Sequence, residues 1–202
     1  VPDGIRHWVD VASTPAGGEV AQRSPGAFRT QGHDDYAGDP TVSDYSLDGR
    51  GSWVRLDPGH EQESATFSGR LVAGCVETLS FLANGRFGDI SAFAERDAPE
   101  GVVHLLDIAE WASPDICRAL HAMRLRGWFE HSNGILVSRT RAPGLPDFSQ
   151  HDAVVDALGM LGLPIVADVE CGHVPPYLAL VQGAETQVVH DGDTHTITQR
   201  MR

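Results

Sequence analysis

The sequence contains no lysine, so all 15 of its basic residues are arginines. Acidic residues number 28, and the 202-residue chain therefore carries a formal net charge of −13. No cluster of arginines offsets this balance. Because an acidic surface repels phosphate groups, we expect neither nucleic acid nor an anionic membrane surface to be a partner.

Cysteine is also scarce. The chain has three cysteines, Cys75, Cys117 and Cys171, an odd number at wide spacing. This pattern is not a disulfide framework, and it predicts a protein of the reducing cytoplasm. Cys-x-x-Cys and His-x-x-x-His pairs are absent as well. We therefore expect no bound metal and no cofactor.

Long apolar runs are missing. No run approaches the roughly 20 residues that would span a bilayer, and no charged-then-apolar leader stands at the N-terminus. The hydrophobic share of 41% still suffices for one sizeable core. The sequence thus predicts a folded domain without a membrane span.

The first part of the chain, residues 1–66, is rich in Gly, Pro, Ser and Asp, as in TPAGGEV, RSPGAF and LDPGHEQES. These residues favour turns and loops, and so long an irregular segment is unusual within a compact domain. We interpret it as a linker or arm that wraps a neighbouring surface, and the chain as a fragment of something longer. Candidate anchors of the arm are its aromatic residues Trp8, Phe28, Tyr36 and Trp53.

A second unit extends from residue 67 to residue 202. In its first segment, apolar residues at helical spacing predict a helix from about Val72 to Ala83. SPDICRALHAMRLRG and SQHDAVVDALGMLG predict two further helices, the first with Ser113 as its N-cap and Pro114 in its first turn.

Short apolar runs alternate with these helices. VVHLLD at 102–107, GILVS at 134–138 and PIVAD at 164–168 predict buried strands. LALVQ, ETQVVH and THTITQ also predict strands, with Asp191-Gly192 as a hairpin turn between the last two. The alternation indicates an α/β fold: a small parallel-type sheet with crossover helices and an antiparallel C-terminal hairpin, preceded by the irregular arm.

Polar residues collect where the predicted parallel strands end. Asp107 and Glu110 follow the first strand, Ser138 and Arg139 end the second, and residues 168–173, DVECGH, follow the third. The carboxyl ends of parallel strands meet at one edge of a sheet, and open α/β sheets bind their ligands there. We therefore expect the functional site at this edge.

His173, in the last of these segments, has three interpretations. It is a hydrogen-bonded loop histidine, a metal ligand together with Cys171, His104 or Asp168, or a catalytic base. A catalytic base needs an acid to orient its imidazole, and the end of the first strand offers two carboxylates.

Three segments resemble motifs of one family. GRLVAGCVETLSFL is similar to GRLxGGNLETL, and HLLDIAEWASPDICRALHAMRLRGWFEHSNGILVSR is similar to LLLETSEE…P…V…LRxMxxRGLLE…VLVGR. PIVADVECGHVPPYLALVQGAETQVV resembles P(V/I)xxDVDFGHTDPxxxxPxGxxxxV. These motifs are typical of the LD-carboxypeptidase family, in the branch of the microcin C immunity carboxypeptidases. The resemblance runs in order from about Ser68 to the C-terminus.

The resemblance implies a serine peptidase with a Ser-Glu-His triad, whose serine lies on an N-terminal α/β domain absent from this chain. His173 matches the family histidine. The family glutamate falls on Asp107, whose side chain is one methylene shorter, and Glu110 matches a later acid of the same run. Either carboxylate is therefore a candidate for the triad acid. A nucleophile elbow of the form Gly-x-Ser-x-Gly does not occur in the sequence.

Three further residues are candidate substrate contacts. Cys75 stands where the family has its GGN, and Glu77 matches the acid of its LET. Arg139 is a candidate for binding the terminal carboxylate of a substrate. Each also has an ordinary interpretation: buried packing for Cys75, a structural carboxylate for Glu77 and a solvated surface arginine for Arg139.

The sequence therefore predicts the C-terminal part of a serine carboxypeptidase or amide hydrolase that acts on a small peptide or peptide-like conjugate. The nucleophile would come from a preceding segment or a separate chain. One alternative is a non-catalytic remnant of the fold that binds a peptide or another subunit, and another is a metal-dependent hydrolase at His173, Asp168 and Cys171. Apolar surface left where the missing domain would sit predicts a homodimer or a complex.

Overall fold

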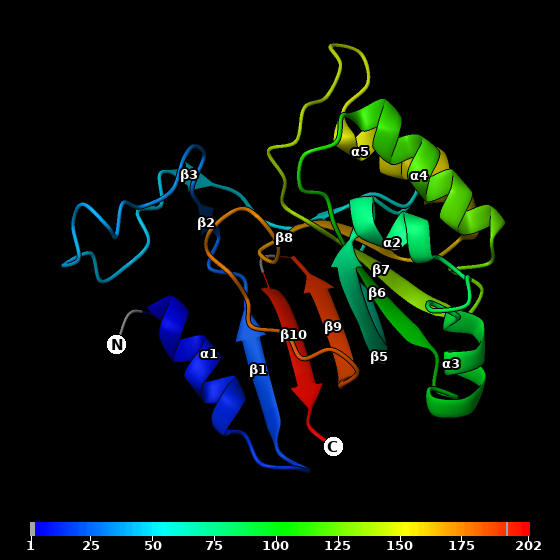
Figure 1. The fold of residues 1–202 in the computed structure, drawn as a ribbon, viewed down its shortest axis with the longest axis horizontal. Coiled ribbons are helices and arrows are strands. Elements are labelled where there is room, and N and C mark those ends of the chain that lie inside the picture. The colour runs from blue at the N-terminus through cyan, green and yellow to red at the C-terminus, as the bar shows by residue number, and fades with distance from the viewer. Residues whose placement is uncertain (1–2, 193) are drawn as a thin grey trace.

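The computed structural model describes residues 3–192 and 194–202. In that part of the chain, eight strands form one mixed sheet in the order β1-β10-β9-β5-β6-β7-β8-β4 (Figure 1). A separate pair, β2 (Ala27–Phe28) and β3 (Gly49–Arg50), lies within the N-terminal arm. The helices are α1 (Asp3–Ser13), α2 (Val76–Leu82), α3 (Ile90–Asp97), α4 (Ser113–Leu125) and α5 (Gln150–Leu158), followed by the 3-10 turn η1 (Gly159–Leu161).

Four parallel strands form the centre of the sheet: β5 (Ala65–Cys75), β6 (Val102–Asp107), β7 (Ser132–Ser138) and β8 (Ile165–Val169). Every residue of β6 is buried, as expected for a strand that is covered on both faces. Antiparallel strands flank this centre. They are β4 (Val54–Arg55) beside β8, and β9 (Glu185–Asp191), β10 (Thr194–Arg200) and β1 (Glu19–Arg23) beyond β5.

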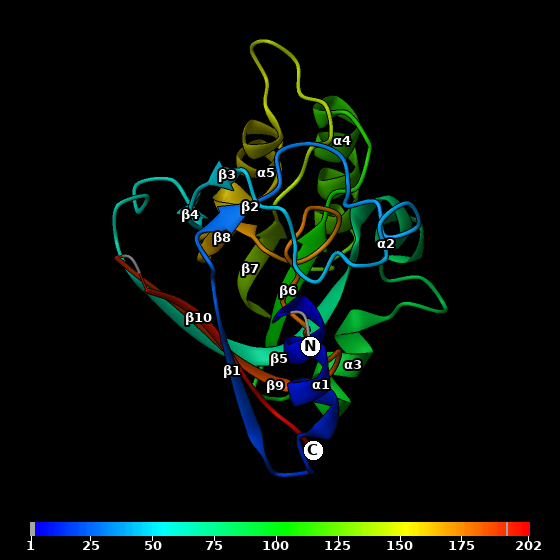
Figure 2. The same cartoon turned by 90° about the vertical axis from the view of Figure 1, so that its left-hand side faces the viewer.

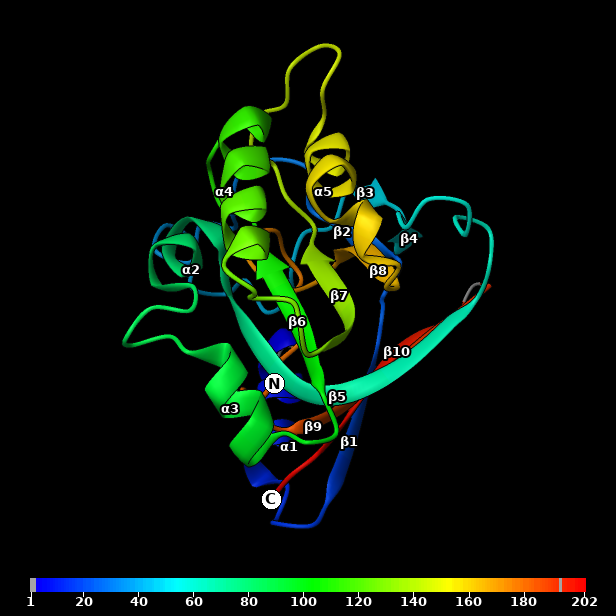
Figure 3. The ribbon, with the colours of Figure 1, turned by 90° about the vertical axis from the view of Figure 1, so that its right-hand side faces the viewer.

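The core has two parts, one on each face of the sheet. Helices α2 to α5 cover one face, where Ile116, Leu120 and Val154 pack against Leu106 and other strand residues (Figure 3). The opposite face packs against Trp53 of the arm and Leu178 of the segment before β9. The parallel strands are thus held between two layers, and their parallel pairing brings their carboxyl ends to one edge.

The predicted α/β class is confirmed. Strand β6 has the predicted bounds, and β7, β8 and the β9–β10 hairpin lie close to theirs. Helix α5 begins with a capping box in which Ser149 and Asp152 bond to each other's backbone N–H. Helix α4 differs in one detail: its N-cap is Ala112, and Ser113 is a buried helical residue that donates to the Phe148 carbonyl at 2.6 Å.

One predicted helix begins too early, and one predicted strand does not form. Strand β5 continues to Cys75, so the segment predicted to be helical from Val72 becomes the end of a strand followed by the short helix α2. Strand β6 pairs with this end of β5 as far as Cys75, and a buried strand accepts consecutive apolar residues as readily as a helix does. The segment LALVQ, at 178–182, forms no strand, because Gln22 and Gln199 accept its backbone N–H groups at 2.9 and 2.8 Å.

The arm is more regular than its composition predicts. Helix α1 occupies its start, and β1 joins the sheet beside β10 (Figure 2). Trp53 is 3% exposed and is an anchor as predicted, whereas Trp8 and Tyr36 are 64% and 50% exposed and anchor nothing. The division of the chain near residue 66 stays a prediction. None of the helices that the structure describes is long and apolar enough to cross a bilayer.

Candidate functional site

The parallel register brings the ends of β6, β7 and β8 to one edge of the sheet. Asp107 is the last residue of β6 and Ser138 the last of β7, and β8 leads within a few residues to His173. Leu106 is paired with Val137 and Ser138 with Val169. Side chains from three segments of the chain are therefore assembled by strand pairing alone, as the sequence predicts for this edge.

An acid–histidine pair lies at this edge. The Nδ1 atom of His173 is 2.7 Å from Oδ2 of Asp107. The carboxylate is nearly buried, with a side-chain exposure of 10%, whereas the imidazole is 61% exposed. Because Nδ1 is engaged by Asp107, the opposite ring nitrogen, Nε2, faces away from the carboxylate and is the atom that can exchange a proton with a ligand.

The second carboxylate oxygen of Asp107 is held by Ser138. The Ser138 hydroxyl donates to Asp107 Oδ1 at 2.6 Å and accepts the backbone N–H of Ile108 at 3.3 Å. Both oxygens of the nearly buried carboxylate are thus hydrogen-bonded, which keeps the acid in one orientation. Ser138 lies at the strand end as predicted, but its bond to Asp107 was not predicted; a hydroxyl at the end of the neighbouring parallel strand is the signal that could have indicated it.

Gly172 lets the loop approach the acid. Its φ of +124° is unfavourable for other residues, and a Cβ at this position would overlap Asp107 Oδ1 and lie 3.0 Å from Ser138 Cβ. The glycine is thus required both by the backbone and by the lack of space. It brings His173 over the strand end and within reach of Asp107.

Glu77 supports the loop after β6. Its Oε1 atom accepts three consecutive backbone N–H groups, from Ala109, Glu110 and Trp111, at 3.0, 2.9 and 3.1 Å. Its Oε2 atom accepts the Cys75 thiol at 2.8 Å. Burial alone would raise the pKa of Glu77, but the hydrogen bonds from the Cys75 thiol and the backbone outweigh it and keep the pKa below its usual value.

The same contacts define the environment of Cys75. Burial, with a further contribution from the hydrogen bond to Glu77, raises the pKa of the Cys75 thiol to about 11. The thiol is therefore protonated near neutral pH and is not an activated nucleophile. The substrate-binding roles of Cys75 and Glu77 stay predictions; their hydrogen bonds hold the residues next to the acid in place.

The structure separates the two candidate acids. Glu110 is exposed, and no ion pair joins it to His173 among the residues that the structure describes. Only its backbone N–H is engaged at this site, by Glu77. Asp107 is therefore the carboxylate that the fold places beside His173.

Arg139 connects the arm to the strand ends. Its guanidinium donates to the Asp168 carbonyl at 3.0 Å and to the Ser52 carbonyl at 3.4 Å, and it lies 4.1 Å from the ring centroid of Phe28. The side chain is 9% exposed, so it is not a solvated arginine. Its substrate-binding role stays a prediction, because these contacts engage it with the protein itself.

The residues of the metal alternative are not brought together. His104 lies in the core between Trp128 and Phe129, and burial lowers its pKa to about 3. Burial, with the nearby charge of Asp107, raises the pKa of Cys171 to about 12. Asp168 is paired with Arg139 and His151. Within the described ranges, the structure groups three metal-binding side chains elsewhere, on α4 and α5.

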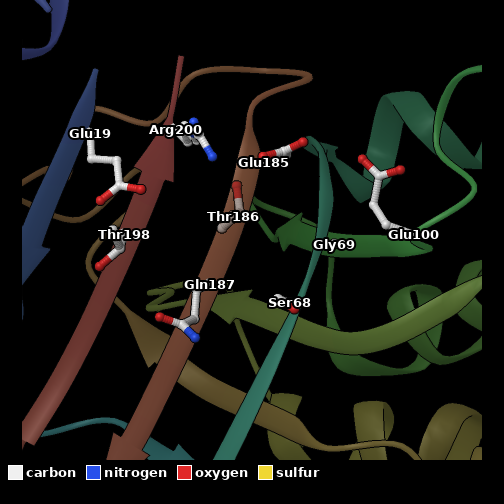
Figure 4. A pocket seen from close by; sticks show the side chains of 9 residues that line it. All are labelled: Glu19, Ser68, Gly69, Glu100, Glu185, Thr186, Gln187, Thr198 and Arg200. Atoms are coloured by element: carbon white, nitrogen blue, oxygen red, sulfur yellow. The ribbon is translucent and has the colours of Figure 1, made fainter. Parts of the chain in front are cut away.

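A pocket on the sheet contains none of the predicted site residues. It lies over β1, β10, β9 and β5 and is lined by Glu19, Glu100, Glu185 and Arg200 together with polar strand residues (Figure 4). Arg70 and Arg202 already pair with Glu100, and Arg202 also pairs with Glu185. Its charges are thus largely satisfied within the protein, and the strand-end pair is the better candidate site.

Comparisons with known proteins identify the family and the fold of the chain. A family model described as the LD-carboxypeptidase C-terminal domain matches residues 68–188. No curated protein matched the chain in a separate comparison.

Solved structures give the same fold. A microcin C7 self immunity protein, MccF, in complex with aspartyl sulfamoyl adenosine is 13% identical, with a TM-score of 0.73, over 98% of this chain and 55% of its own. A muramoyltetrapeptide carboxypeptidase from Oxalobacter formigenes is 13% identical, with a TM-score of 0.66, over 97% and 54%. An MccF-like protein from Bacillus anthracis str. Ames is 15% identical, with a TM-score of 0.62, over 91% and 52%.

The chain thus spans about half the length of these structures. The family model covers more than half of the chain itself, from within β5 into β9. The chain therefore belongs to the LD-carboxypeptidase family and contains the C-terminal domain of that family.

Proposed function

We propose that this chain supplies the base and the acid of a Ser-acid-His triad in a serine carboxypeptidase or amide hydrolase. His173 is the base, Asp107 is the acid, and the nucleophilic serine comes from a segment outside this chain. The observation that carries the proposal is the 2.7 Å contact between an exposed imidazole and a nearly buried carboxylate at the carboxyl edge of the sheet. Family membership supports the same reaction class.

The chemistry follows from the orientation of the imidazole. The serine oxygen attacks the scissile carbonyl while Nε2 of His173 accepts the proton of the serine hydroxyl. Nε2 then donates that proton to the leaving amine. Asp107 stabilises the imidazolium from the Nδ1 side. The shorter acid remains sufficient because Gly172 brings the histidine loop close and Ser138 fixes the carboxylate.

The proposed substrate is a small peptide or a peptide-like conjugate. Two relatives indicate its chemistry: MccF is described in complexes with aspartyl sulfamoyl adenosine and glutamyl sulfamoyl guanosine, and another relative is named a muramoyltetrapeptide carboxypeptidase. Both names point to compact ligands with an amino-acid component. We therefore propose an aminoacyl conjugate or a short peptide as the class to test first.

A non-catalytic role is the second candidate. The sequence contains no Gly-x-Ser-x-Gly elbow, so this chain alone lacks the nucleophile that the reaction requires. In this role the same edge binds a peptide or another subunit without turnover, and the pair of Asp107 and His173 contributes hydrogen bonds only. A substrate analogue would then bind with the same affinity whether or not the imidazole of His173 can transfer a proton.

Replacement of His173 tests the catalytic proposal. We expect His173→Ala, in the protein that includes the nucleophile segment, to lower kcat/KM by roughly 10³-fold or more, because the serine loses its base. Asp107→Asn should cause a loss of similar order. The measurement is hydrolysis of aminoacyl sulfamoyl nucleotides and of peptides ending in a D-residue. His151→Ala is the matched control, because its imidazole is 41% exposed and also lies beside an aspartate, Asp168.

The outcomes separate the two roles. Loss of turnover in His173→Ala with retained activity in His151→Ala supports the triad. Turnover that is unchanged in His173→Ala contradicts it. The non-catalytic role is supported instead if the wild-type protein binds the ligand without turnover and if neither variant prevents this binding.

A further inference from the structure

Helices α4 and α5 lie side by side over the same face of the sheet (Figure 3). Cys117 and His121 are four residues apart on α4 and therefore share one face of that helix. Asp156 on α5 faces them. The thiol, imidazole and carboxylate ligand atoms of these three residues all lie within 4.8 Å of one another.

The three side chains converge on one point. Asp156 Oδ1 is 2.7 Å from Nε2 of His121 and 3.3 Å from Sγ of Cys117. In a tetrahedral zinc site, the bond lengths to sulfur, nitrogen and oxygen place neighbouring ligand atoms roughly 3.3–3.8 Å apart. A small outward movement of the imidazole therefore converts the hydrogen-bonded cluster into a coordination geometry.

We propose that Cys117, His121 and Asp156 form a Zn²⁺ site that bridges α4 and α5, with a water molecule as the fourth ligand. The site shares no residue with the pair of Asp107 and His173. It is therefore independent of the proposed hydrolase activity and serves to join two helices of the domain.

The donor set selects the metal. Thiolate and imidazole donors favour zinc over magnesium or calcium, which prefer oxygen ligands. One thiolate and one carboxylate together balance the charge of the ion. His121 and Asp156 are 35% and 56% exposed in their side chains, so an ion and its water molecule can reach the ligand atoms from solvent.

Binding exchanges a proton for the metal. Burial, followed by the hydrogen bond to Asp156, raises the pKa of the Cys117 thiol to about 11, so the sulfur carries a proton in the metal-free protein. The hydrogen bond from His121, and then that from Cys117, keeps the pKa of Asp156 below its usual value, so the carboxylate is already ionised. The thiol proton is released to solvent when the sulfur coordinates zinc.

Arg124 opposes the metal. Its NH2 group lies 3.1 Å from Nδ1 of His121, and because arginine only donates, Nδ1 accepts and the proton resides on Nε2. Zinc at Nε2 requires this proton to move to Nδ1, so the guanidinium must turn away. Removal of this arginine should therefore strengthen zinc binding.

The test is metal binding by the metal-free 202-residue chain. Titration with Zn²⁺ by calorimetry gives the affinity, and Co²⁺ gives a thiolate-to-cobalt charge-transfer band that reports the sulfur ligand. We expect Cys117→Ser and Asp156→Asn each to weaken zinc binding at least about tenfold, and Arg124→Gln to strengthen it. Zinc should also raise the Tm of the wild type more than that of Cys117→Ser.

Cys75→Ser is the matched control. Cys75 also lies beside a carboxylate, with 2.8 Å between its sulfur and Glu77, but without a histidine among its hydrogen-bond partners in the described part of the chain. This variant should keep the zinc affinity and the cobalt band. Unchanged zinc affinity in Cys117→Ser, or a cobalt complex that lacks the sulfur band, would overturn the proposal. Circular dichroism of each variant confirms that it is folded.

Discussion

At the scale of single residues, the candidate site depends on one glycine. Gly172 has a φ of +124°, and the atoms nearest to the position of a Cβ belong to Asp107 and Ser138. Any side chain at this position would push the histidine loop away from the acid. The distance between Asp107 and His173 is thus set by the absence of a side chain.

Gly172→Ala should therefore disrupt the site. We expect a loss of about 3 kcal/mol or more in the free energy of unfolding, because backbone strain adds to steric overlap. Turnover by the protein that includes the nucleophile segment should fall as well. The measurements are urea unfolding and the steady-state rate.

Gly162→Ala is the control for the backbone term. Gly162 has a φ of +65°, and a Cβ there would meet no atom within 4 Å. Gly162→Ala should lose only about 1 kcal/mol in the free energy of unfolding and keep its activity. Equal losses in the two variants would show that the space beside Asp107 is unimportant.

The residues of the pair could be predicted from the sequence, but their support could not. Asp107 and His173 each follow an apolar run that ends in polar residues, and strand-end placement brings them to one edge. The choice between Asp107 and Glu110 needed coordinates, because it depends on how the loop turns after β6. The bond from Ser138 likewise depends on the register between β6 and β7.

At the scale of elements, Glu77 joins α2 to the loop that follows β6. One carboxylate oxygen accepts three consecutive N–H groups that no strand or helix satisfies. These groups lie in the residues between Asp107 and α4. A helix and a loop that are distant in sequence are thus held by one charged side chain.

Glu77→Gln should destabilise the domain in a pH-dependent way. The pKa of Glu77 is lower in the folded chain than its ordinary value of 4.5, so its contribution to stability is fully present above that pH. The contribution is lost as the pH falls through the folded-state pKa. At pH 7 we expect the free energy of unfolding of the wild type to exceed that of Glu77→Gln by about 1–2 kcal/mol. This difference should shrink below pH 4.5.

Urea unfolding at several pH values measures this difference. Glu110→Gln is the control, because its exposed carboxylate lies in the same loop. The free energy of unfolding of Glu110→Gln should equal that of the wild type at every pH. A difference between wild type and Glu77→Gln that grows on acidification would contradict the assignment.

Prediction of elements failed where one pattern fits two structures. LVAGCV is apolar at positions that suit both a helix and a central strand, and the parallel pairing with β6 decides for a strand up to Cys75. Helix α3 was not predicted because its sequence, ISAFAERD, is short and weakly apolar. In the arm, β1 forms because β10 provides an edge for it, which local composition does not reveal.

At the scale of the whole molecule, the arm is joined to the histidine loop through Glu170. This residue is fully buried. One of its carboxylate oxygens accepts the Trp53 indole N–H at 2.6 Å, and the other accepts the Ser24 hydroxyl at 2.7 Å. Because Glu170 lies three residues before His173, the packing of the arm bears directly on the candidate site.

Trp53→Phe should loosen this connection. Phenylalanine fills similar space but cannot donate, so a buried carboxylate oxygen loses its partner. We expect a cost of about 1–3 kcal/mol in unfolding free energy, with faster hydrogen exchange in the arm and in residues 170–173. Trp8 is 64% exposed, so Trp8→Phe should change neither the unfolding free energy nor the hydrogen exchange of these residues. Unaltered exchange around His173 in Trp53→Phe would show that the arm and the loop are independent.

The pairing of β1 with β10 has a consequence for how the chain folds. Glu19 is opposite Arg200, and Arg23 is opposite Thr196, so one edge of the sheet joins two segments that lie far apart in the sequence. During translation β1 has no partner until β10 has left the ribosome, and contacts of such high sequence separation form slowly. The parallel centre can condense earlier, and the emerging polypeptide would carry an unpaired strand that chaperones or aggregation can capture until β10 is available for pairing.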